Sequence, residues 1–274
     1  VYIDDGHTYP AYGTTEIRCT ECERLKPVDG LSYELDEETD TYTVTRCEDY
    51  SGRAFYSIPM FHEGKVVAKI AEGVFARKKT YALEIPETVV EIGKGAFEGL
   101  EGDASVKIFG ETRIGENAFS GSEMRSVEMP KVTYIGKGAF RSCTLVTEIK
   151  GITASVIDEM AFENCALLKT VELCEGVTEI RSCAFAYSSI KSIVIPASVT
   201  SIAGDAFDDY SSGCAAYYKG TAEDLEAKPQ VKDGLWRCTV YYYSETEPKV
   251  NDSGGYVGNF WHYDAKNSIV VWSK

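Results

Sequence analysis

Nine cysteines and three histidines are the side chains of this sequence best suited to hold a metal or to act as nucleophiles. Cys19 and Cys22 form a Cys-x-x-Cys pair, with His7 and Cys47 as possible partners in a tetrahedral zinc site. One such pair without a second is also what a local disulfide or two free thiols would produce. We favour these two alternatives, so Cys19 and Cys22 stay weak metal candidates and we assign no metal ligand.

No group of residues in the sequence forms a catalytic constellation. His7, His62 and His262 lie in different segments, and none has a nucleophile at the spacing of a known motif. The segment GKGAFEG, which starts at Gly93, is superficially similar to a phosphate-binding loop, but it lacks the GxGxxG spacing and no helical pattern follows it. We therefore predict no catalytic residue, no cofactor and no enzymatic activity. A zinc-dependent enzyme that uses the N-terminal cysteines is the less favoured alternative.

The charge balance excludes two classes of partner. The 274 residues include 28 Lys and Arg against 43 Asp and Glu, which gives a net charge of −15. Nucleic acids and anionic lipids attract clustered basic residues, so we expect no nucleic-acid partner. The longest uncharged stretch is Ser192 to Gly204, only 13 residues, which is shorter than the ~20 that a membrane-spanning helix needs, so we expect no membrane insertion. The chain begins with Val1 and without a signal pattern, so we expect a processed or excised product.

A repeat of about 22 residues dominates the middle of the chain. An Ile is followed five residues later by a Phe, and an Ala precedes that Phe in six of the seven copies. Before each later Ile lies a second apolar cluster. Where this cluster has two members, as in Val127 and Met129, one residue separates them, which is typical of a half-buried strand, and before Ile157 the cluster is Ile149 alone. Such units bury their apolar faces by stacking, so the strands should align in one parallel sheet. The pairs are Ile70/Phe75, Ile92/Phe97, Ile114/Phe119, Ile135/Phe140, Ile157/Phe162, Ile180/Phe185 and Ile202/Phe207.

The segments VTYIGKGAFRSC (Val132 to Cys143) and IVIPASVTSIAGDAF (Ile193 to Phe207) closely resemble the BspA-like leucine-rich repeats of bacterial cell-surface proteins. This resemblance implies a leucine-rich-repeat solenoid that is mostly β, with a curved parallel sheet and short turns or 3-10 pieces. It also implies an extracellular or cell-surface setting and a role in adhesion or ligand binding, with no catalytic residue. The family usually has Gly after the Ile, and the departures leave the turn geometry open at four positions: Ala71, Asp158, Arg181 and Ala203.

We divide the chain into an N-terminal segment and cap (1–47), about seven repeats (48–216) and a C-terminal cap (217–274). The segment from Leu31 to Cys47 resembles the strands that open such solenoids. In the C-terminal cap, Thr221 and Asp224 predict the start of one short helix. Strands are predicted at Cys238 to Tyr243, Gly258 to Tyr263 and Ser268 to Trp272, and we assign the aromatic residues there to the core of the cap rather than to sugar stacking.

Repeat phase also predicts which cysteines are buried. Cys143 and Cys165 each lie three residues after a repeat Phe, and Cys183 lies two residues before one. We expect all three to be small core residues, which is common for free cysteine.

The candidate binding site is a row of exposed residues on the sheet. The middle residue of each apolar-x-apolar strand should point away from the core, and stacked strands place these residues about 4.8 Å apart on the exposed, concave face. The three acids Glu128, Glu148 and Glu172 are consecutive in this row, which favours a basic protein or peptide partner. The alternative is that a net charge of −15 places acids on every exposed surface. The full row is Glu84, Lys107, Glu128, Glu148, Glu172 and Val194.

We therefore expect a noncatalytic surface-exposed or secreted binding protein whose partner is an unknown protein or host surface ligand. A structural spacer that displays other domains is the alternative from a different class.

Overall fold

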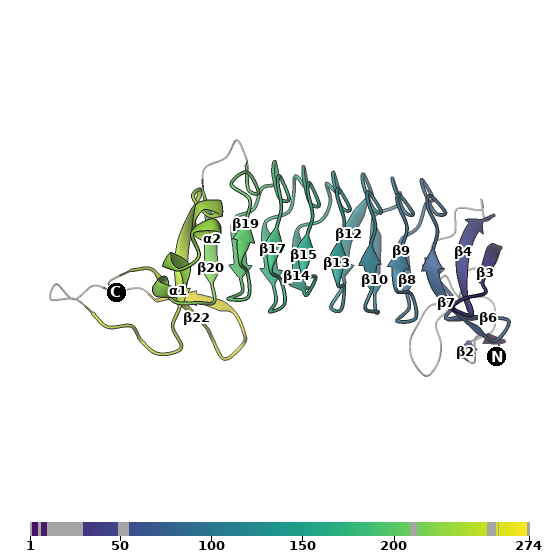
Figure 1. The fold of residues 1–274 in the computed structure, drawn as a ribbon, viewed down its shortest axis with the longest axis horizontal. Coiled ribbons are helices and arrows are strands. Elements are labelled where there is room, and N and C mark those ends of the chain that lie inside the picture. The colour runs from purple at the N-terminus through teal and green to yellow at the C-terminus, as the bar shows by residue number, and fades with distance from the viewer. Residues whose placement is uncertain are drawn as a thin grey trace.

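The computed structural model describes residues 2–4, 7–9, 30–48, 55–208, 213–250, 256 and 258–272, with the backbone alone at 2–4 and 7–9. The repeats stack in single file along the long axis of the molecule (Figure 1), and each repeat is one turn of a β-solenoid. The predicted leucine-rich-repeat solenoid, mostly β with parallel sheets, is confirmed.

Long strands form one side of the solenoid, in two sheets whose successive repeat strands pair in parallel. We call these the long-strand sheets. The first consists of β5 (Phe55–Ser57), β8 (Ala82–Ile85), β10 (Ala104–Ile108) and β12 (Met124–Glu128). The second consists of β14 (Glu148–Ile152), β16 (Thr170–Leu173), β18 (Ser192–Ile195), β20 (Cys214–Tyr218), β21 (Cys238–Tyr243), β22 (Phe260–Tyr263) and β23 (Ile269–Val271).

Short strands that end at the repeat Ile form a ten-stranded sheet, the short-strand sheet. Its N-terminal part is a hairpin of β3 (Leu31–Asp36) and β4 (Thr41–Cys47), followed by β7 (Lys65–Ile70) with β6 (Phe61–His62) paired to it, which confirms the predicted opening strands. A separate hairpin joins β1 (Tyr2–Asp4) to β2 (His7–Tyr9). The two-residue strands are β9 (Glu91–Ile92), β11 (Arg113–Ile114), β13 (Tyr134–Ile135), β15 (Val156–Ile157), β17 (Glu179–Ile180) and β19 (Ser201–Ile202).

The seven repeat phenylalanines form one continuous stack through the core, from Phe75 to Phe207. Neighbouring rings lie 5.0–5.6 Å apart with interplanar angles of 2–7°. In the first six, the Phe N–H donates a hydrogen bond of 2.7–2.8 Å to the carbonyl of the Ala that precedes the Phe of the next turn. Main-chain hydrogen bonds therefore join the turns along the Ala-Phe side as well as along the two strand sides.

The residue after the repeat Ile lies where neighbouring turns approach closely, and it is glycine in three of the seven repeats. A Cβ at Gly93, Gly115 or Gly136 would lie 2.6–2.8 Å from the Ile carbonyl oxygen of the preceding turn. The equivalent Asp158 and Arg181 keep the same main-chain hydrogen bond at 3.0 Å, and their side chains pair with each other, Nη1 to Oδ1, at 3.0 Å. The departures from glycine therefore preserve the turn-to-turn bond and add an ion pair across it.

Two short helices replace the short strand at the C-terminal end (Figure 1). The first, α1 (Ala222–Glu226), begins with the predicted capping box between Thr221 and Asp224. The second, α2 (Pro229–Gly234), was not predicted, and it packs on β19, where a Cβ at Gly234 would lie 2.4 Å from the Ile202 Cβ. The predicted strand Cys238 to Tyr243 has the same bounds in the structure, and the last two predicted strands are shorter, as β22 and β23. Because β20 crosses residue 216, the division between repeats and cap there stays a prediction.

Candidate functional site

The outward face of the long-strand sheets holds most of the predicted binding row. Lys107 lies opposite Glu84 on one neighbouring strand and opposite Glu128 on the other. The Lys107 Nζ is 3.8 Å from a Glu128 carboxylate oxygen. Glu172 lies opposite Val194, as the spacing predicted. The structure thus brings these five residues into two aligned groups, one on each long-strand sheet.

The prediction that Glu148 belongs to this row is wrong. Glu148 pairs with Thr170, while Lys150 and Gly151 together lie opposite Glu172 in a two-against-one bulge. Gly151 adopts the left-handed conformation, with φ of 73°, that the bulge requires. The outward residues are therefore Lys107 and Glu128 on the first long-strand sheet and Lys150 and Glu172 on the second, one base and one acid on each. The run of three acids that favoured a basic partner does not exist.

Glu84 and Val194 are buried, not exposed, at 4% and 2% of their accessible surface. At the N-terminal end, β5 continues the sheet, so that Glu84 lies between Lys107 and a buried Ser57. At the C-terminal end, Val194 pairs with Tyr217, whose ring packs edge-on against Trp261 at 5.5 Å. Sequence reasoning missed both because the neighbouring strands, β5 and β20, lie outside the series of apolar clusters on which the row was based.

The hairpin of β22 and β23 folds over the C-terminal end of the outward face. In Figure 1, β22 runs along the long axis, across the direction of the repeat strands. Trp261 in β22 is fully buried, and its Nε1 donates a hydrogen bond of 3.2 Å to the Tyr218 carbonyl. Its ring contacts Tyr243 and Tyr263 at 5.2 and 5.0 Å. These aromatic side chains form a packed core, in agreement with their assignment to the cap.

Tyr263 ties this hairpin to the repeats. Its hydroxyl donates a hydrogen bond to the Glu172 carboxylate over 3.4 Å. Burial, followed by the negative charge of Glu172, raises the pKa of Tyr263 to about 12. The neutral phenol that holds the hairpin in place is therefore the form that exists at physiological pH.

A groove lies between β12 and β14, where the long-strand side is interrupted. These two strands are neighbours but belong to different sheets. The groove has a volume of about 420 Å³. Its polar lining consists of Arg125, Ser126, Glu128, Thr147, Glu148 and Lys150.

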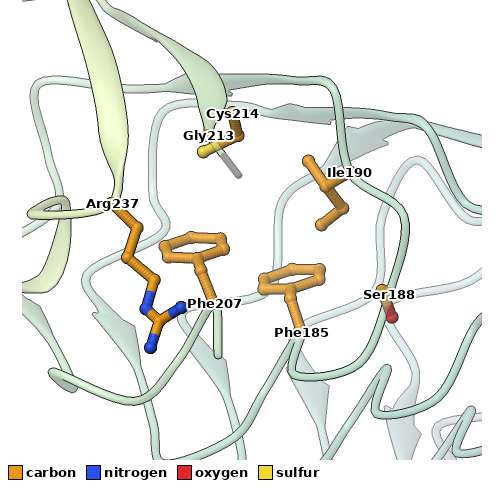
Figure 2. Close-up of a pocket in the computed structure, with 7 residues that line it drawn as sticks. All are labelled: Phe185, Ser188, Ile190, Phe207, Gly213, Cys214 and Arg237. Carbon is orange, nitrogen blue, oxygen red and sulfur yellow. The ribbon is translucent and has the colours of Figure 1, made fainter. Parts of the chain in front are cut away.

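A second, much smaller cavity lies where the phenylalanine stack ends. Figure 2 shows the rings of Phe185 and Phe207 side by side, with Arg237 and Cys214 near them. Its volume is about 20 Å³, which is room for about one water molecule, so it is a packing gap rather than a ligand site.

The described cysteines include core thiols, a turn thiol and a disulfide. Cys143 and Cys165 are buried as predicted, and their Sγ atoms donate to the carbonyls of Phe119 and Phe140 at 3.1 and 3.2 Å. Burial raises the pKa of Cys143, and it raises that of Cys165 to about 12, so neither is an activated thiol. Cys183 was predicted to be buried and is only half-buried, because it lies on a turn with φ of 54° beside Asp205.

The disulfide between Cys214 and Cys238 joins β20 to β21, and the sequence analysis did not anticipate it. The signal was present, since the two residues are 24 apart, close to one repeat, and therefore lie at the same height on adjacent turns.

Cys19 and Cys22 lie outside the described residues, as does the side chain of His7. Within the described ranges, no group of three or more His, Cys, Asp or Glu side chains could hold a metal ion. Within the same ranges, no helix is long and apolar enough to cross a membrane.

Comparison with solved structures finds similarity to several bacterial proteins. The leucine-rich repeat protein of T. pallidum aligns over 78% of this chain and 97% of its own, with 18% identity and a TM-score of 0.51. A leucine-rich cell surface protein of Faecalibacterium prausnitzii aligns over 74% and 97%, with 17% identity and a TM-score of 0.26. The pneumococcal antigen PcpA aligns over 78% and 96%, with 12% identity and a TM-score of 0.36.

No curated protein sequence matches the chain. The sequence profile described as the BspA type leucine rich repeat region matches six copies, over residues 68–151 and 104–214. These two ranges together span more than half of the 274 residues. They also coincide with the turns that carry the phenylalanine stack. The chain therefore belongs to the family of BspA-type leucine-rich repeat proteins.

Proposed function

We propose that this chain is a noncatalytic binding protein that works outside the bacterial cell, secreted or on the cell surface, and that it binds a protein or host ligand through the outward face of the long-strand sheets. The observation that carries the proposal is the polar, accessible stretch between β10 and β14. There the side chains of Glu128, Glu148 and Lys150 are 63%, 56% and 62% exposed. Repeat solenoids use such extended faces for binding.

Two further observations support the extracellular part of the proposal. The Cys214–Cys238 disulfide is of a kind that persists in oxidising compartments and is rare in the cytosol. The net charge of −15 keeps a secreted protein soluble and away from anionic membrane surfaces.

A charge exchange on the face tests the proposal. The double variant Lys107→Glu/Glu128→Lys keeps the net charge but reverses the two charges that a ligand would meet. The matched control is Lys137→Glu/Glu159→Lys, which exchanges an ion pair of 2.6 Å that lies away from the long-strand sheets. Both variants and the wild type are measured for adhesion to cultured host cells and to a panel of immobilised extracellular proteins.

We expect the wild type and the control to bind equally and the face variant to bind at least tenfold more weakly. Equal binding by all three would remove the face from the proposal. Absence of binding by the wild type would favour the alternative of a spacer that displays other domains.

A further inference from the structure

We infer that Trp236 and its neighbours form a second binding site, which takes a neutral oligosaccharide by stacking a gluco- or galacto-configured pyranose ring on the exposed indole. The site lies where the phenylalanine stack ends, on residues that are not part of the outward face of the long-strand sheets. The inference therefore goes beyond the proposed function and does not depend on it.

Trp236 is the most exposed large hydrophobic side chain among the described residues, with 63% of its surface accessible. It follows α2 directly, and the apolar residues Val231 and Leu235 at this helix are buried. The other two tryptophans differ, since Trp261 is fully buried and Trp272 is half-buried. Trp236 is therefore not part of the packed core of the C-terminal cap.

The exposed indole is held in one orientation. Its Nε1 donates a hydrogen bond of 2.9 Å to the carbonyl of Gly204 on the preceding turn. The guanidinium of Arg237, which lies beside Phe207 in Figure 2, is stacked over the indole with its Cζ 4.4 Å from the ring centroid. Because Nε1 has a partner and Arg237 covers one face, Trp236 offers a ligand the other face of its ring.

This fixed orientation distinguishes Trp236 from an ordinary exposed hydrophobic side chain. Single apolar side chains on a surface are common and need no functional explanation. A binding group that is already ordered, however, loses less conformational entropy when a ligand arrives. The order extends to Arg237, which forms an ion pair with Asp208, Nε to Oδ1, at 3.2 Å. The indole, the guanidinium and the carboxylate thus form one preorganised surface.

A flat aromatic face beside polar groups suits a sugar. The face of an aromatic ring is the negative part of its quadrupole, so it attracts groups with partial positive charge. The C–H groups on one face of a pyranose ring form such a surface, and the hydroxyls project from the rim of the ring. Arg237 and Asp208, whose side chains are 36% and 41% exposed, supply N–H donors and carboxylate acceptors. Sugar hydroxyls both donate and accept, so they can bond to both groups.

A second exposed aromatic residue lies on the same side of the solenoid. The Tyr187 N–H donates a hydrogen bond of 2.6 Å to the Asp208 carbonyl, and the Tyr187 side chain is 45% exposed. Tyr187 belongs to the turn before Asp208, and Trp236 belongs to the turn after it, because α2 packs on β19. Two aromatic side chains that flank one turn can contact different units of an oligosaccharide, which favours a chain of sugars over a single one.

The charges around Trp236 favour a neutral ligand. Arg237 is balanced by Asp208, and the other exposed charges close in the sequence are Asp233 and Lys232, which is itself ion-paired. The site therefore has no excess of positive charge that would attract a sulfated or sialylated glycan.

The alternative occupant is a protein, since Trp, Tyr and Arg are also common in the hot spots of protein interfaces. Hot spots lie at the centre of a well-packed patch that is depleted of charged residues. The residues that flank Trp236 are instead charged, namely Lys232, Asp233 and Arg237. This setting favours the sugar.

Trp236→Ala tests the inference. The variant removes an exposed ring and one hydrogen bond to the exposed Gly204, so the fold should persist. The matched control is Phe61→Ala, which removes an exposed aromatic ring from β6. The probes are four neutral oligosaccharides, cellotetraose, maltotetraose, chitotetraose and lacto-N-tetraose, with a heparin tetrasaccharide as the anionic comparison. Binding is measured by saturation-transfer NMR and by titration of tryptophan fluorescence, and folding by circular dichroism.

We expect the wild type and Phe61→Ala to bind at least one neutral oligosaccharide equally, and Trp236→Ala to bind it at least fivefold more weakly. The saturation should be strongest at the C–H protons of one ring face. Trp236→Phe keeps an aromatic ring at this position and should bind more tightly than Trp236→Ala. A residue with a purely structural role would not produce this order.

Four results would overturn the inference. They are no binding of any neutral oligosaccharide, tighter binding of the heparin tetrasaccharide, equal affinity of the wild type and Trp236→Ala, and loss of adhesion by Trp236→Ala to extracellular proteins stripped of their glycans, which would identify a protein partner. The face variant Lys107→Glu/Glu128→Lys should bind the oligosaccharides like the wild type. Failure of the sugar site therefore leaves the proposed function standing, and failure of the outward face leaves the sugar site standing.

Discussion

Tyr263, in the last hairpin, donates a hydrogen bond to Glu172, which lies 91 residues earlier in the repeat region, over an oxygen–oxygen distance of 3.4 Å. This contact joins the C-terminal cap to the outward face of the sheet, at the point where the charged outward residues give way to apolar and aromatic side chains. It sets the boundary between the part of the face that a ligand can reach and the part that the protein covers itself.

The Tyr263 contact should weaken at high pH. The pKa of this phenol is raised from 10.0 to about 12 by burial and by Glu172, so the folded state favours the neutral form. Its contribution to stability is complete below about pH 10 and is lost as the pH rises from 10 towards 12. We expect hydrogen exchange in β22 to accelerate over this interval in the wild type and to change much less in Tyr263→Phe. Parallel profiles for the two proteins would contradict this prediction.

The phenylalanine stack should account for a large share of the stability. Phe140→Ala removes a ring that stacks on both neighbours at 5.2 and 5.1 Å, and it should lower the free energy of unfolding by ~3–5 kcal/mol. Phe61 is exposed, so Phe61→Ala should change the free energy of unfolding by less than ~0.5 kcal/mol. Chemical denaturation measures both variants, and a comparable loss in the two would show that the stack is not the core.

Met160 should be a site where glycine stabilises the protein. It precedes its repeat Phe by two residues and has φ of 56°, where other repeats have Gly95 and Gly138. The left-handed conformation costs a residue with a side chain ~1–2 kcal/mol. Glycine avoids this cost, but it loses more conformational entropy on folding, which offsets part of the gain. We expect Met160→Gly to raise the melting temperature, with a net gain of up to ~1 kcal/mol. Met160→Ala keeps the backbone strain and should not raise the melting temperature.

The buried cysteines should tolerate serine better than valine. Ser122 and Ser188 occupy the position equivalent to Cys143, and each donates a hydrogen bond of 2.8 Å to a Phe carbonyl of the preceding turn. Cys143→Ser preserves this bond to Phe119, whereas Cys143→Val removes it, and loss of a buried partner costs ~1–3 kcal/mol. Urea denaturation should rank the serine variant above the valine variant, and the reverse order would exclude a role for the hydrogen bond.

The thiols should also differ in reactivity. Burial raises the pKa of all three thiols, Cys143, Cys165 and Cys183, but only Cys183 is half-buried rather than buried. In the folded protein, an alkylating reagent should therefore reach and modify Cys183 well before Cys143 and Cys165. Mass spectrometry of peptides after timed labelling measures the order. Early modification of Cys143 would indicate that the core opens locally at that turn.

The sequence alone was sufficient to predict the regular part of the molecule. Ile and Phe recur every 21 to 23 residues, so the same local structure is repeated seven times. The position of each residue within the repeat was therefore enough to predict the solenoid, the phenylalanine stack and the burial of Cys143 and Cys165. The strand Cys238–Tyr243 and the capping box at Thr221 were also predicted, because both depend on residues that are close in the sequence.

The tertiary structure decided the features that depend on distant segments or on register. The sequence distance from the repeat Ile157 cannot reveal that Gly151 forms a bulge. The register of β14 depends on how well Ile149 and Ile152 fit opposite Val171 and Leu173 in β16. That choice places Glu148 opposite Thr170 and therefore outside the row. Likewise, only folding brings Tyr217 and Trp261 over Val194, because segments far apart in the chain cover a surface whose local pattern reads as exposed.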